Sequence, residues 1–310
     1  MTDFSKPVER IAVSVPSEHA GQRIDSYLPR RFNWRSRQYF LGLLADGTVR
    51  VNGQQVKKAF RLATGDEITL ELPPEYRTQF DYGAIPLAVL HEDAALLVID
   101  KPGNLAVQPT GKYIHENLLN RLRYWYRAER DEQDADPCIV HRLDRETSGV
   151  IVFAKGKDAA RMVTRQFADK RARKTYLAVV HGQPPATGTI DAPLLSTEDR
   201  HVVVDARGKP AVTHYEVVRS LGERSLVKLT LETGRQHQLR VHLAHLGHPI
   251  VSDELYGRPE DRAGNQLPGR HMLHAHRLEL IHPDGQPLVF EAPMPADMRL
   301  LVQSPGAGST

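Results

Sequence analysis

The chain has few features of an exported or membrane protein. Its 310 residues include a single cysteine, Cys138, which cannot form an intramolecular disulfide or complete a cysteine-rich zinc site. The aliphatic run over residues 94–99 is far shorter than the roughly 20 residues that a membrane-spanning helix needs. The first residues contain early acids and lack the basic and then apolar pattern of a signal peptide. We therefore expect a globular protein of the reducing cytoplasm, without a membrane segment.

Charge is nearly balanced over the whole chain, with a formal net charge of +3, but it is unevenly distributed. Residues 21–61 and residues 161–174 are strongly basic, whereas the rest of the chain is acidic. Two basic blocks suggest a polyanionic partner, since neutralising phosphates releases condensed counterions. Either block alone fits a solvated helix face equally well. The candidate phosphate contacts of the first block are Arg23, Arg35, Arg37, Lys57 and Lys58.

The sequence patterns predict two domains. Residues 21 to about 73 contain two short amphipathic helical segments and then an Asn52-Gly53 pair between alternating strand-formers, which indicates a hairpin. Later segments are mostly short strands with three helical patterns, which favours a predominantly antiparallel α+β architecture. We expect a small α/β domain over 17–75, a linker over 76–86, a large domain over 87–300 and a flexible tail over 301–310. Removing residues 1–75 should then leave the large domain folded.

The segment from His141 to Gly149 contains an aspartate between two arginines, Arg142 and Arg145. Neighbouring positive charge lowers the pKa of a carboxyl group and keeps Asp144 ionised, as a nucleophile or a general base requires. The same spacing also fits a surface ion pair before a turn, and spacing alone favours that interpretation.

A second segment, from Glu232 to His242, is predicted to place a glycine before a helix whose first turn carries Arg235 and His237. Such a helix start binds anions, either a phosphate or a carboxylate such as Asp144, although a capped amphipathic helix explains the pattern as well. Four histidines, at 237, 242, 245 and 248, suggest a metal, but no cysteine or suitably spaced glutamate accompanies them. We expect no metal.

Several motifs resemble one known family. HRLDRETSG resembles the defining motif of the RluA-type pseudouridine synthases, and four further segments match that family in order. They are KPGNLAVQP (101–109), KTYLAVVHG (174–182), ETGRQHQLRVHLAHLGHPIVSDELYG (232–257) and LHAHRLELIHP (273–283). Residues 21–61 resemble the small RNA-binding domain named after the fourth protein of the small ribosomal subunit. Gln108, Gln236, Ser252 and Leu280 differ from the residues usual in the family.

The resemblance implies a pseudouridine synthase fold and a role for individual residues. Asp144 would be the nucleophilic carboxylate, Arg235 would pair with it, and Tyr176 would stack on the target uracil. Arg145 would enter the RNA to fill the space that the flipped uridine leaves. The RNA contacts of the large domain would also include Arg142, Lys174, His237 and Arg240.

The activity so implied is isomerisation of uridines to pseudouridine in structured RNA, which needs no cofactor because it involves no net redox change or hydrolysis. Large-subunit ribosomal RNA is the expected target and transfer RNA the alternative. We expect a monomer without an obligatory protein partner. Two other hypotheses stay open: a non-catalytic RNA-binding or ribosome-assembly factor, favoured by the N-terminal basic block, and a histidine-metal hydrolase.

Overall fold

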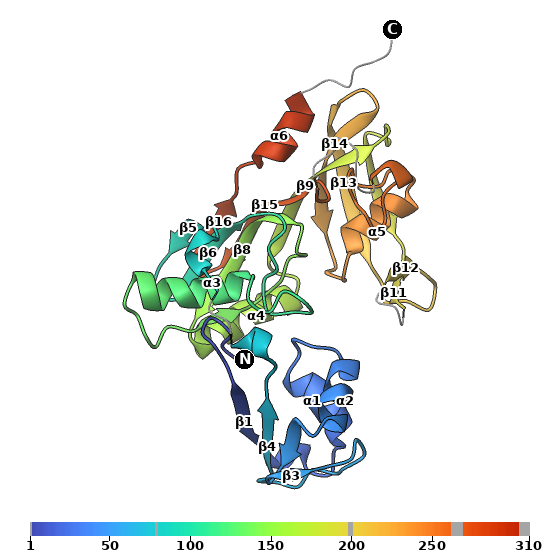
Figure 1. Ribbon diagram of the computed structural model, residues 1–310. Coiled ribbons are helices and arrows are strands. Elements are labelled where there is room, and N and C mark those ends of the chain that lie inside the picture. The colour runs from blue at the N-terminus through green and yellow to red at the C-terminus, as the bar shows by residue number, and fades with distance from the viewer. Residues whose placement is uncertain (1, 78–79, 198–200, 262–268, 304–310) are drawn as a thin grey trace. The chain divides into compact units, whose positions relative to one another are not determined.

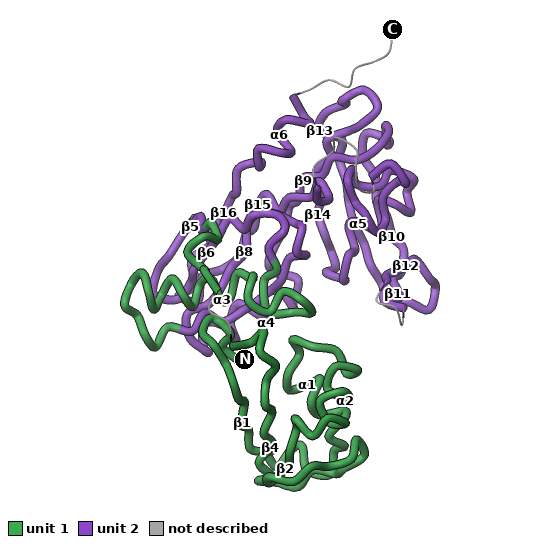
Figure 2. Tube along the Cα trace, viewed as in Figure 1, with its two compact units in different colours: residues 1–86, 106–135 green, residues 87–105, 136–310 purple. Residues whose placement is uncertain are grey.

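The computed structural model describes residues 2–77, 80–197, 201–261 and 269–303. The chain divides into two compact units, which Figure 2 shows in different colours. Unit 1 comprises residues 1–86 and 106–135, and unit 2 comprises residues 87–105 and 136–310. The segment 106–135 thus packs with the N-terminal residues, although it lies within residues 87–300, the expected large domain. No helix of the described residues is long and apolar enough to cross a membrane.

The N-terminal part of unit 1 is a small α/β fold (Figure 1). Two helices, α1 (Ile24–Arg31) and α2 (Arg37–Ala45), accompany a four-stranded sheet in the order β1-β4-β2-β3. Its strands are β1 (Arg10–Ser14), β2 (Val49–Val51), β3 (Gln54–Gln55) and β4 (Glu67–Glu71). The hairpin between β2 and β3 is confirmed: Asn52 and Gly53 both have positive φ, 49° and 78°, as a type I′ turn requires.

The segment 106–135 is built into the core of unit 1. It contains α3 (Leu118–Tyr124), which continues into a π-helical turn (Trp125–Glu129). Ile114 is buried in the same apolar cluster as Phe4 and Trp34, and the Gly111 N–H donates to the Trp34 carbonyl at 3.1 Å. The Arg127 guanidinium pairs with the Asp3 carboxylate.

Residues 76–86, the expected linker, carry two fully buried tyrosines. The Tyr82 hydroxyl donates to the Phe4 carbonyl at 2.6 Å, and Arg121 Nε donates to the Ile85 carbonyl at 2.8 Å. The described residues of this stretch, 76–77 and 80–86, therefore contact both the N-terminal residues and α3 within unit 1.

Unit 2 is built on a ten-stranded mixed sheet in the order β10-β13-β14-β9-β15-β8-β6-β5, with β16 beside β15 and β7 beside β8. Of these pairings only β15 with β8 is parallel in the part of the chain that the structure describes, so the predicted predominantly antiparallel α+β architecture is confirmed. The strands are β5 (Ala88–Glu92), β6 (Leu96–Lys101), β7 (Pro137–Ile139), β8 (Ser148–Lys155), β9 (Arg173–His181), β10 (Thr187–Asp191), β13 (Val212–Ser220), β14 (Arg224–Leu231), β15 (Leu273–Ile281) and β16 (Pro287–Glu291).

Three helices and a short strand pair complete unit 2. The helices are α4 (Lys157–Ala168), α5 (Gln238–His245) and α6 (Ala296–Gln303), and the pair is β11 (Leu194–Ser196) with β12 (Val202–Val204). Because α6 extends to residue 303, the flexible tail expected from residue 301 is wrong for residues 301–303; residues 304–310 lie outside the described residues.

Deleting residues 1–75 should unfold residues 106–135, which revises the expectation of a fully folded remainder. Ile114 would lose its apolar surroundings and Arg127 its carboxylate partner. Hydrogen–deuterium exchange should show that the α3 amides lose protection, while those of β13 and β14 keep theirs and serve as the internal control. Unchanged protection of α3 in the truncated chain would contradict this prediction.

Candidate active site

Asp144 lies in the loop between β7 and β8. The loop is closed by a hydrogen bond from the Thr147 N–H to the Asp144 carbonyl at 3.2 Å. Gly149, with φ of 109°, then begins the close parallel approach of β8 to β15, and a Cβ there would lie 2.2 Å from the Ala275 carbonyl oxygen. The Asp144 side chain is 30% exposed, so its carboxylate is accessible from solvent.

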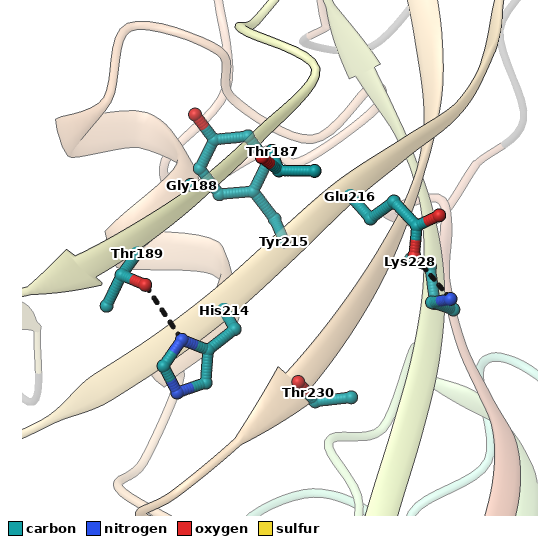
Figure 3. A pocket seen from close by; sticks show the side chains of 8 residues that line it. All are labelled: Thr187, Gly188, Thr189, His214, Tyr215, Glu216, Lys228 and Thr230. Atoms are coloured by element: carbon teal, nitrogen blue, oxygen red, sulfur yellow. Dashed lines mark hydrogen bonds and ion pairs between the residues drawn. The ribbon is translucent and has the colours of Figure 1, made fainter.

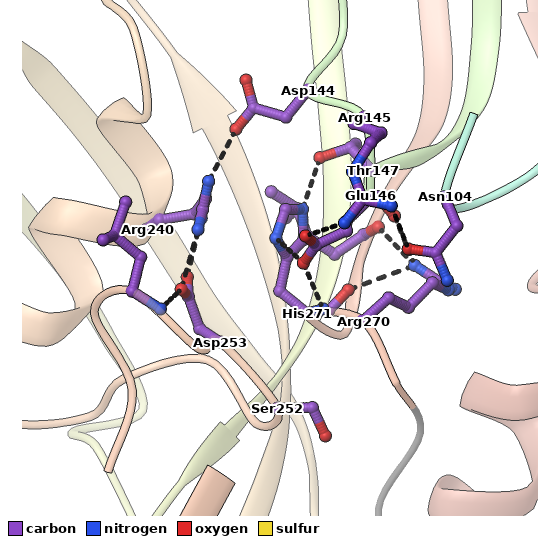
Figure 4. A network of polar contacts seen from close by, with 12 residues as sticks. Asn104, Asp144, Arg145, Glu146, Thr147, Arg240, Ser252, Asp253, Arg270 and His271 are labelled. Atoms are coloured by element: carbon purple, nitrogen blue, oxygen red, sulfur yellow. Dashed lines mark hydrogen bonds and ion pairs between the residues drawn. The ribbon is translucent and has the colours of Figure 1, made fainter. Parts of the chain in front are cut away.

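The carboxylate of Asp144 is paired with Arg240, on the first turn of α5. Arg240 Nη1 donates to Asp144 Oδ2 at 3.2 Å, while Nε and Nη2 donate to the two oxygens of Asp253 at 2.7 and 2.8 Å (Figure 4). Arg240 is 7% exposed and Asp253 is 1% exposed. Burial alone would lower the pKa of the Arg240 guanidinium, but Asp253 and then Asp144 raise it. The remaining oxygen, Asp144 Oδ1, accepts no hydrogen bond from the described residues.

The expected pairing of Asp144 with Arg235 is wrong. Arg235 is exposed, and its Nε donates to the Pro210 carbonyl at 3.1 Å. The helix begins at Gln238, not near Arg235, because the Gln238 side chain accepts the Arg235 N–H at 3.0 Å and the Thr233 hydroxyl at 2.8 Å. This turn leaves Arg235 outside the helix and puts Arg240, which we expected only to contact RNA, at the carboxylate.

Two buried cations hold the Asp144 loop from behind. Lys101 is fully buried at the end of β6 and donates to the carbonyls of Pro102, Leu105 and Arg145 at 2.8, 2.9 and 3.0 Å. Burial lowers the pKa of Lys101 to about 7. Arg270 donates to the next loop carbonyl, that of Glu146, at 3.0 Å.

Arg270 is itself fixed by the first turn of α6 and by close packing. Its Nε and Nη2 donate to the Asp297 carboxylate at 2.6 and 3.0 Å. A Cβ at Gly103 would lie 2.3 Å from Arg270 Cδ, so the glycine of the KPGN segment leaves the space that this arginine occupies. The loop that follows Lys101 and the loop that contains Asp144 are thereby tied together.

Glu146 and His271 form a polar pair beneath the same loop (Figure 4). His271 Nδ1 lies 3.1 Å from Glu146 Oε2, and His271 Nε2 lies 2.8 Å from the Thr147 hydroxyl. Burial would raise the pKa of Glu146, but the hydrogen bonds and charge of His271 and the charge of Arg145 lower it to about 2. Arg145 Nη2 also donates to Glu146 Oε1 at 2.7 Å, so this arginine is engaged within the protein.

Tyr176 lies on β9, opposite Ala275 of β15 and Leu229 of β14. It is 8% exposed, and burial together with the charge of Asp144 raises its pKa. Tyr176 is therefore a neutral, mostly apolar surface within the electrostatic range of the Asp144 carboxylate.

Other predicted RNA contacts in unit 2 differ in what surrounds them. Arg142 is exposed and has no partner among the residues that the structure describes. His237 Nδ1 bonds with the Tyr256 hydroxyl at 2.8 Å, and its Nε2 lies 4.0 Å from Asp144 Oδ2. Lys174 is half-buried two residues before Tyr176. Of this set, His237 and Arg240 are gathered at Asp144.

The basic candidates of the small domain fall into two groups. Arg23 and Arg37 both pair with the buried Asp25, and Arg35 Nε donates to the Tyr76 hydroxyl at 2.7 Å. Lys57 and Lys58 are exposed and unpartnered among the described residues, which leaves them available for an anionic partner.

The histidines of the second motif do not converge. His242 bonds with Thr213 and the Ala192 carbonyl, both at 2.9 Å, whereas His248 bonds with the His181 carbonyl at 2.9 Å. The described ranges of the chain contain no cluster of three or more potential metal ligands.

A separate surface depression lies over β10, β13 and β14 (Figure 3). Within it, His214 Nδ1 bonds with the Thr189 hydroxyl at 2.8 Å, and the Lys228 ammonium pairs with Glu216. None of the predicted site residues lines this depression.

Asp253, Lys101 and Arg270 are site residues that sequence reasoning missed. Lys101 left a signal, since a lysine that ends a largely apolar strand, LLVID, is expected to find buried acceptors. Asp253 left none although its partner Arg240 lies in the same motif, because their pairing depends on how the chain folds between them. Arg270 left none, because its partner Asp297 lies in another segment of the chain.

The fold and the site define an RNA-modifying enzyme. Residues 95–245 match the family model of RNA pseudouridylate synthases, and residues 22–68 match that of the S4 domain. A Zymomonas mobilis protein named ribosomal large subunit pseudouridine synthase D is 36% identical, with 95% of this chain and 96% of the relative covered. A Chloroflexus aurantiacus protein named as an uncharacterized RNA pseudouridine synthase is 40% identical, with 95% and 93% covered.

Two solved human structures resemble the chain as well. RNA Pseudouridylate Synthase Domain Containing 4 aligns with a TM-score of 0.59 and 29% identity over 70% of this chain and 92% of its own. RNA Pseudouridylate Synthase Domain Containing 1 aligns with a TM-score of 0.57 and 30% identity over 67% and 84%. The chain belongs to the RNA pseudouridine synthase family, and the predicted family is confirmed.

Ser252 lies at a position where the resemblance to the family implies a glycine. Its φ is 60°, in the left-handed region that favours glycine, and its buried hydroxyl has no partner among the described residues. The backbone conformation explains the usual residue, but nothing in the structure explains the serine.

Replacing Arg240 by lysine should lower the turnover number about 10- to 100-fold, since lysine cannot reproduce the fork that orients Asp144. The matched control is Arg235→Ala, which should change turnover less than about threefold because Arg235 is exposed. Single-turnover release of tritium from uracil carbon five measures both, and a urea melt checks folding. A larger loss in Arg235→Ala than in Arg240→Lys would contradict the assignment.

Acid should weaken the fold through Glu146. A folded-state pKa of about 2 against an ordinary 4.5 means that the carboxylate stabilises the protein above pH 4.5, and that this contribution, about 3 kcal/mol, is lost as pH falls from 4.5 to 2. In Glu146→Gln, urea unfolding should therefore depend less on pH across that window than in the parent protein. Equal pH slopes for the two proteins would show that Glu146 is not the titrating group.

Proposed function

We propose that this enzyme isomerises uridine in large-subunit ribosomal RNA, with Asp144 as the reacting carboxylate. The observation that carries the proposal is the Asp144 carboxylate, which Arg240 holds at one oxygen and which accepts no hydrogen bond at the other from the described residues, in the electrostatic range of Tyr176. The target is supported by the name ribosomal large subunit pseudouridine synthase D, given to relatives from Zymomonas mobilis and Escherichia coli. Transfer RNA is the alternative.

The reaction replaces one bond of the uracil by another. The bond between ribose carbon one and the base nitrogen breaks, the base rotates, and carbon five bonds to the ribose. Carbon five loses a proton and the released nitrogen gains one, so atoms and electrons balance without a redox partner. Asp144 Oδ1 can add to the uracil ring or act on the sugar, and either route needs an ionised carboxylate.

Arg240 acts in this scheme as a positioning residue. Asp253 fixes the guanidinium through its Nε and Nη2, so Nη1 determines where Asp144 Oδ2 lies. Tyr176 offers the detached base a stacking surface during the rotation, and its raised pKa keeps it neutral. Removal of the carbon-five proton then falls to the carboxylate.

A paired uridine must leave its helix to reach Asp144, at a cost of a few kcal/mol. Of the two arginines beside Asp144, Arg142 is the better placed to reach into the RNA, since it is exposed and unpartnered among the described residues. Arg145, which we expected in this role, is bound to Glu146. Lys57 and Lys58 of the small domain supply further contacts to the phosphate backbone. The proposal extends to a monomer of the cytoplasm that needs no cofactor, because the isomerisation involves no net redox change or hydrolysis.

The test uses RNA labelled with tritium at uracil carbon five, purified from cells that lack the gene. The enzyme should release tritium from large-subunit ribosomal RNA, and Asp144→Asn should release less than about one thousandth as much, since an amide cannot act as the nucleophile. Transfer RNA is assayed in parallel. Release from transfer RNA alone would overturn the target, and release by Asp144→Asn would overturn the mechanism. Full rescue of the cells by Asp144→Asn would favour an assembly factor.

A further inference from the structure

Lys174, at the start of β9, is a half-buried cation without a counter-ion. Within the described parts of the chain, no carboxylate lies within 4.0 Å of its Nζ and no acceptor bonds to it. Its neighbours include the Phe167 ring, whose centroid is 5.7 Å from Nζ, Gly234, and the His141 imidazole, whose pKa the Lys174 charge helps to lower after burial. Burial lowers the pKa of Lys174, and no acidic group offsets that effect.

The other buried cations near Asp144 are all satisfied. Arg240 has two carboxylates, Arg270 has one carboxylate and three carbonyls, and Lys101 has three carbonyls. A cation that is withdrawn from water without a partner destabilises a fold, and proteins retain such costs mainly at functional sites. Lys174 therefore needs a partner that the described residues of the folded chain do not supply.

The location of Lys174 beside Tyr176 indicates what kind of partner it can bind. Lys174 and Tyr176 are two residues apart on one strand, so their side chains point to the same face about 7 Å apart. Gly234 belongs to the loop that leads into α5, the helix of Arg240, and a Cβ at Gly234 would lie 3.3 Å from Lys174 Nζ. Because Gly234 has no side chain, the Lys174 ammonium can lie close to this loop.

We propose that Lys174 binds the RNA phosphate next to the uridine whose base lies against Tyr176. The inference rests on the proposed function, since it takes the flipped uridine as the occupant of the Tyr176 surface. A nucleotide presents its nearest phosphates within one residue of its base, and a lysine binds such a group as a point charge. The contact would anchor the backbone on one side of the uridine and leave the base free to turn.

This role predicts an unusual combination of effects for Lys174→Met. RNA affinity should fall, with KM raised about tenfold and kcat changed less than about threefold, since the phosphate contact is the same in ground and transition states. The slope of log affinity against log salt should become shallower by about 0.7 to 0.9, the contribution of one phosphate. The melting temperature should stay equal or rise, because methionine removes an unpaired charge from a half-buried position.

Two further variants complete the experiment. Lys174→Arg should keep most of the affinity because it retains the charge. Lys157→Met, which removes an exposed lysine at the start of α4 outside the basic block, should leave KM and the salt slope unchanged. Binding is measured by filter retention of ribosomal RNA from cells that lack the gene, and turnover by tritium release from the same RNA.

The outcomes separate this inference from the proposed function. An inactive parent enzyme would overturn the proposed function, while filter retention would still test Lys174. Unchanged affinity and salt slope in Lys174→Met would overturn the phosphate site. So would a lowered melting temperature together with an unchanged salt slope, since that result marks a structural lysine.

Discussion

The geometry of the site depends on Arg240, which stands between the carboxylates of Asp253 and Asp144. Arg240 and Asp253 are both buried, and leaving either charge unpaired would cost several kcal/mol. Asp253 takes two N–H groups of the guanidinium and thereby fixes its plane. Only Nη1 remains for Asp144, so a buried pair with no direct part in the chemistry determines where the accessible carboxylate lies.

The Asp144 loop is also fixed through its backbone, in addition to the side-chain contacts of Glu146 and Thr147 with His271. Lys101 and Arg270 bind two consecutive carbonyls, those of Arg145 and Glu146. A buried carbonyl needs a donor, and a cationic donor forms the stronger hydrogen bond. Because the bonds go to the backbone, the residue at 145 can keep a side chain suited to other contacts. The position of the carboxylate is thus set by Arg240, which binds the side chain, and by Lys101 and Arg270, which bind the backbone of the loop.

Local chemistry explains which features the sequence could predict. The hairpin at Asn52-Gly53 depends on two residues that tolerate positive φ, and Asp144 stands in one contiguous motif. Which of the two arginines, Arg235 or Arg240, pairs with Asp144 could not be predicted from such local chemistry. It depends on where α5 begins, which the Gln238 side chain decides through its bonds to Thr233 and Arg235. The sequence motif contains both arginines but does not show at which residue α5 begins.

The placement of residues 106–135 could not be read from sequence order, because contiguity alone would pack them with the strands on either side, β6 and β7. Ile114 and Arg127 instead find their apolar and charged partners among the first residues of the chain. The chain connection at residues 105–106 bears on the site. Residue 106 follows directly after Leu105, whose carbonyl binds Lys101, and the same ammonium binds the Asp144 loop. The chain thus enters unit 1 directly after the residue whose carbonyl helps to hold the Lys101 ammonium.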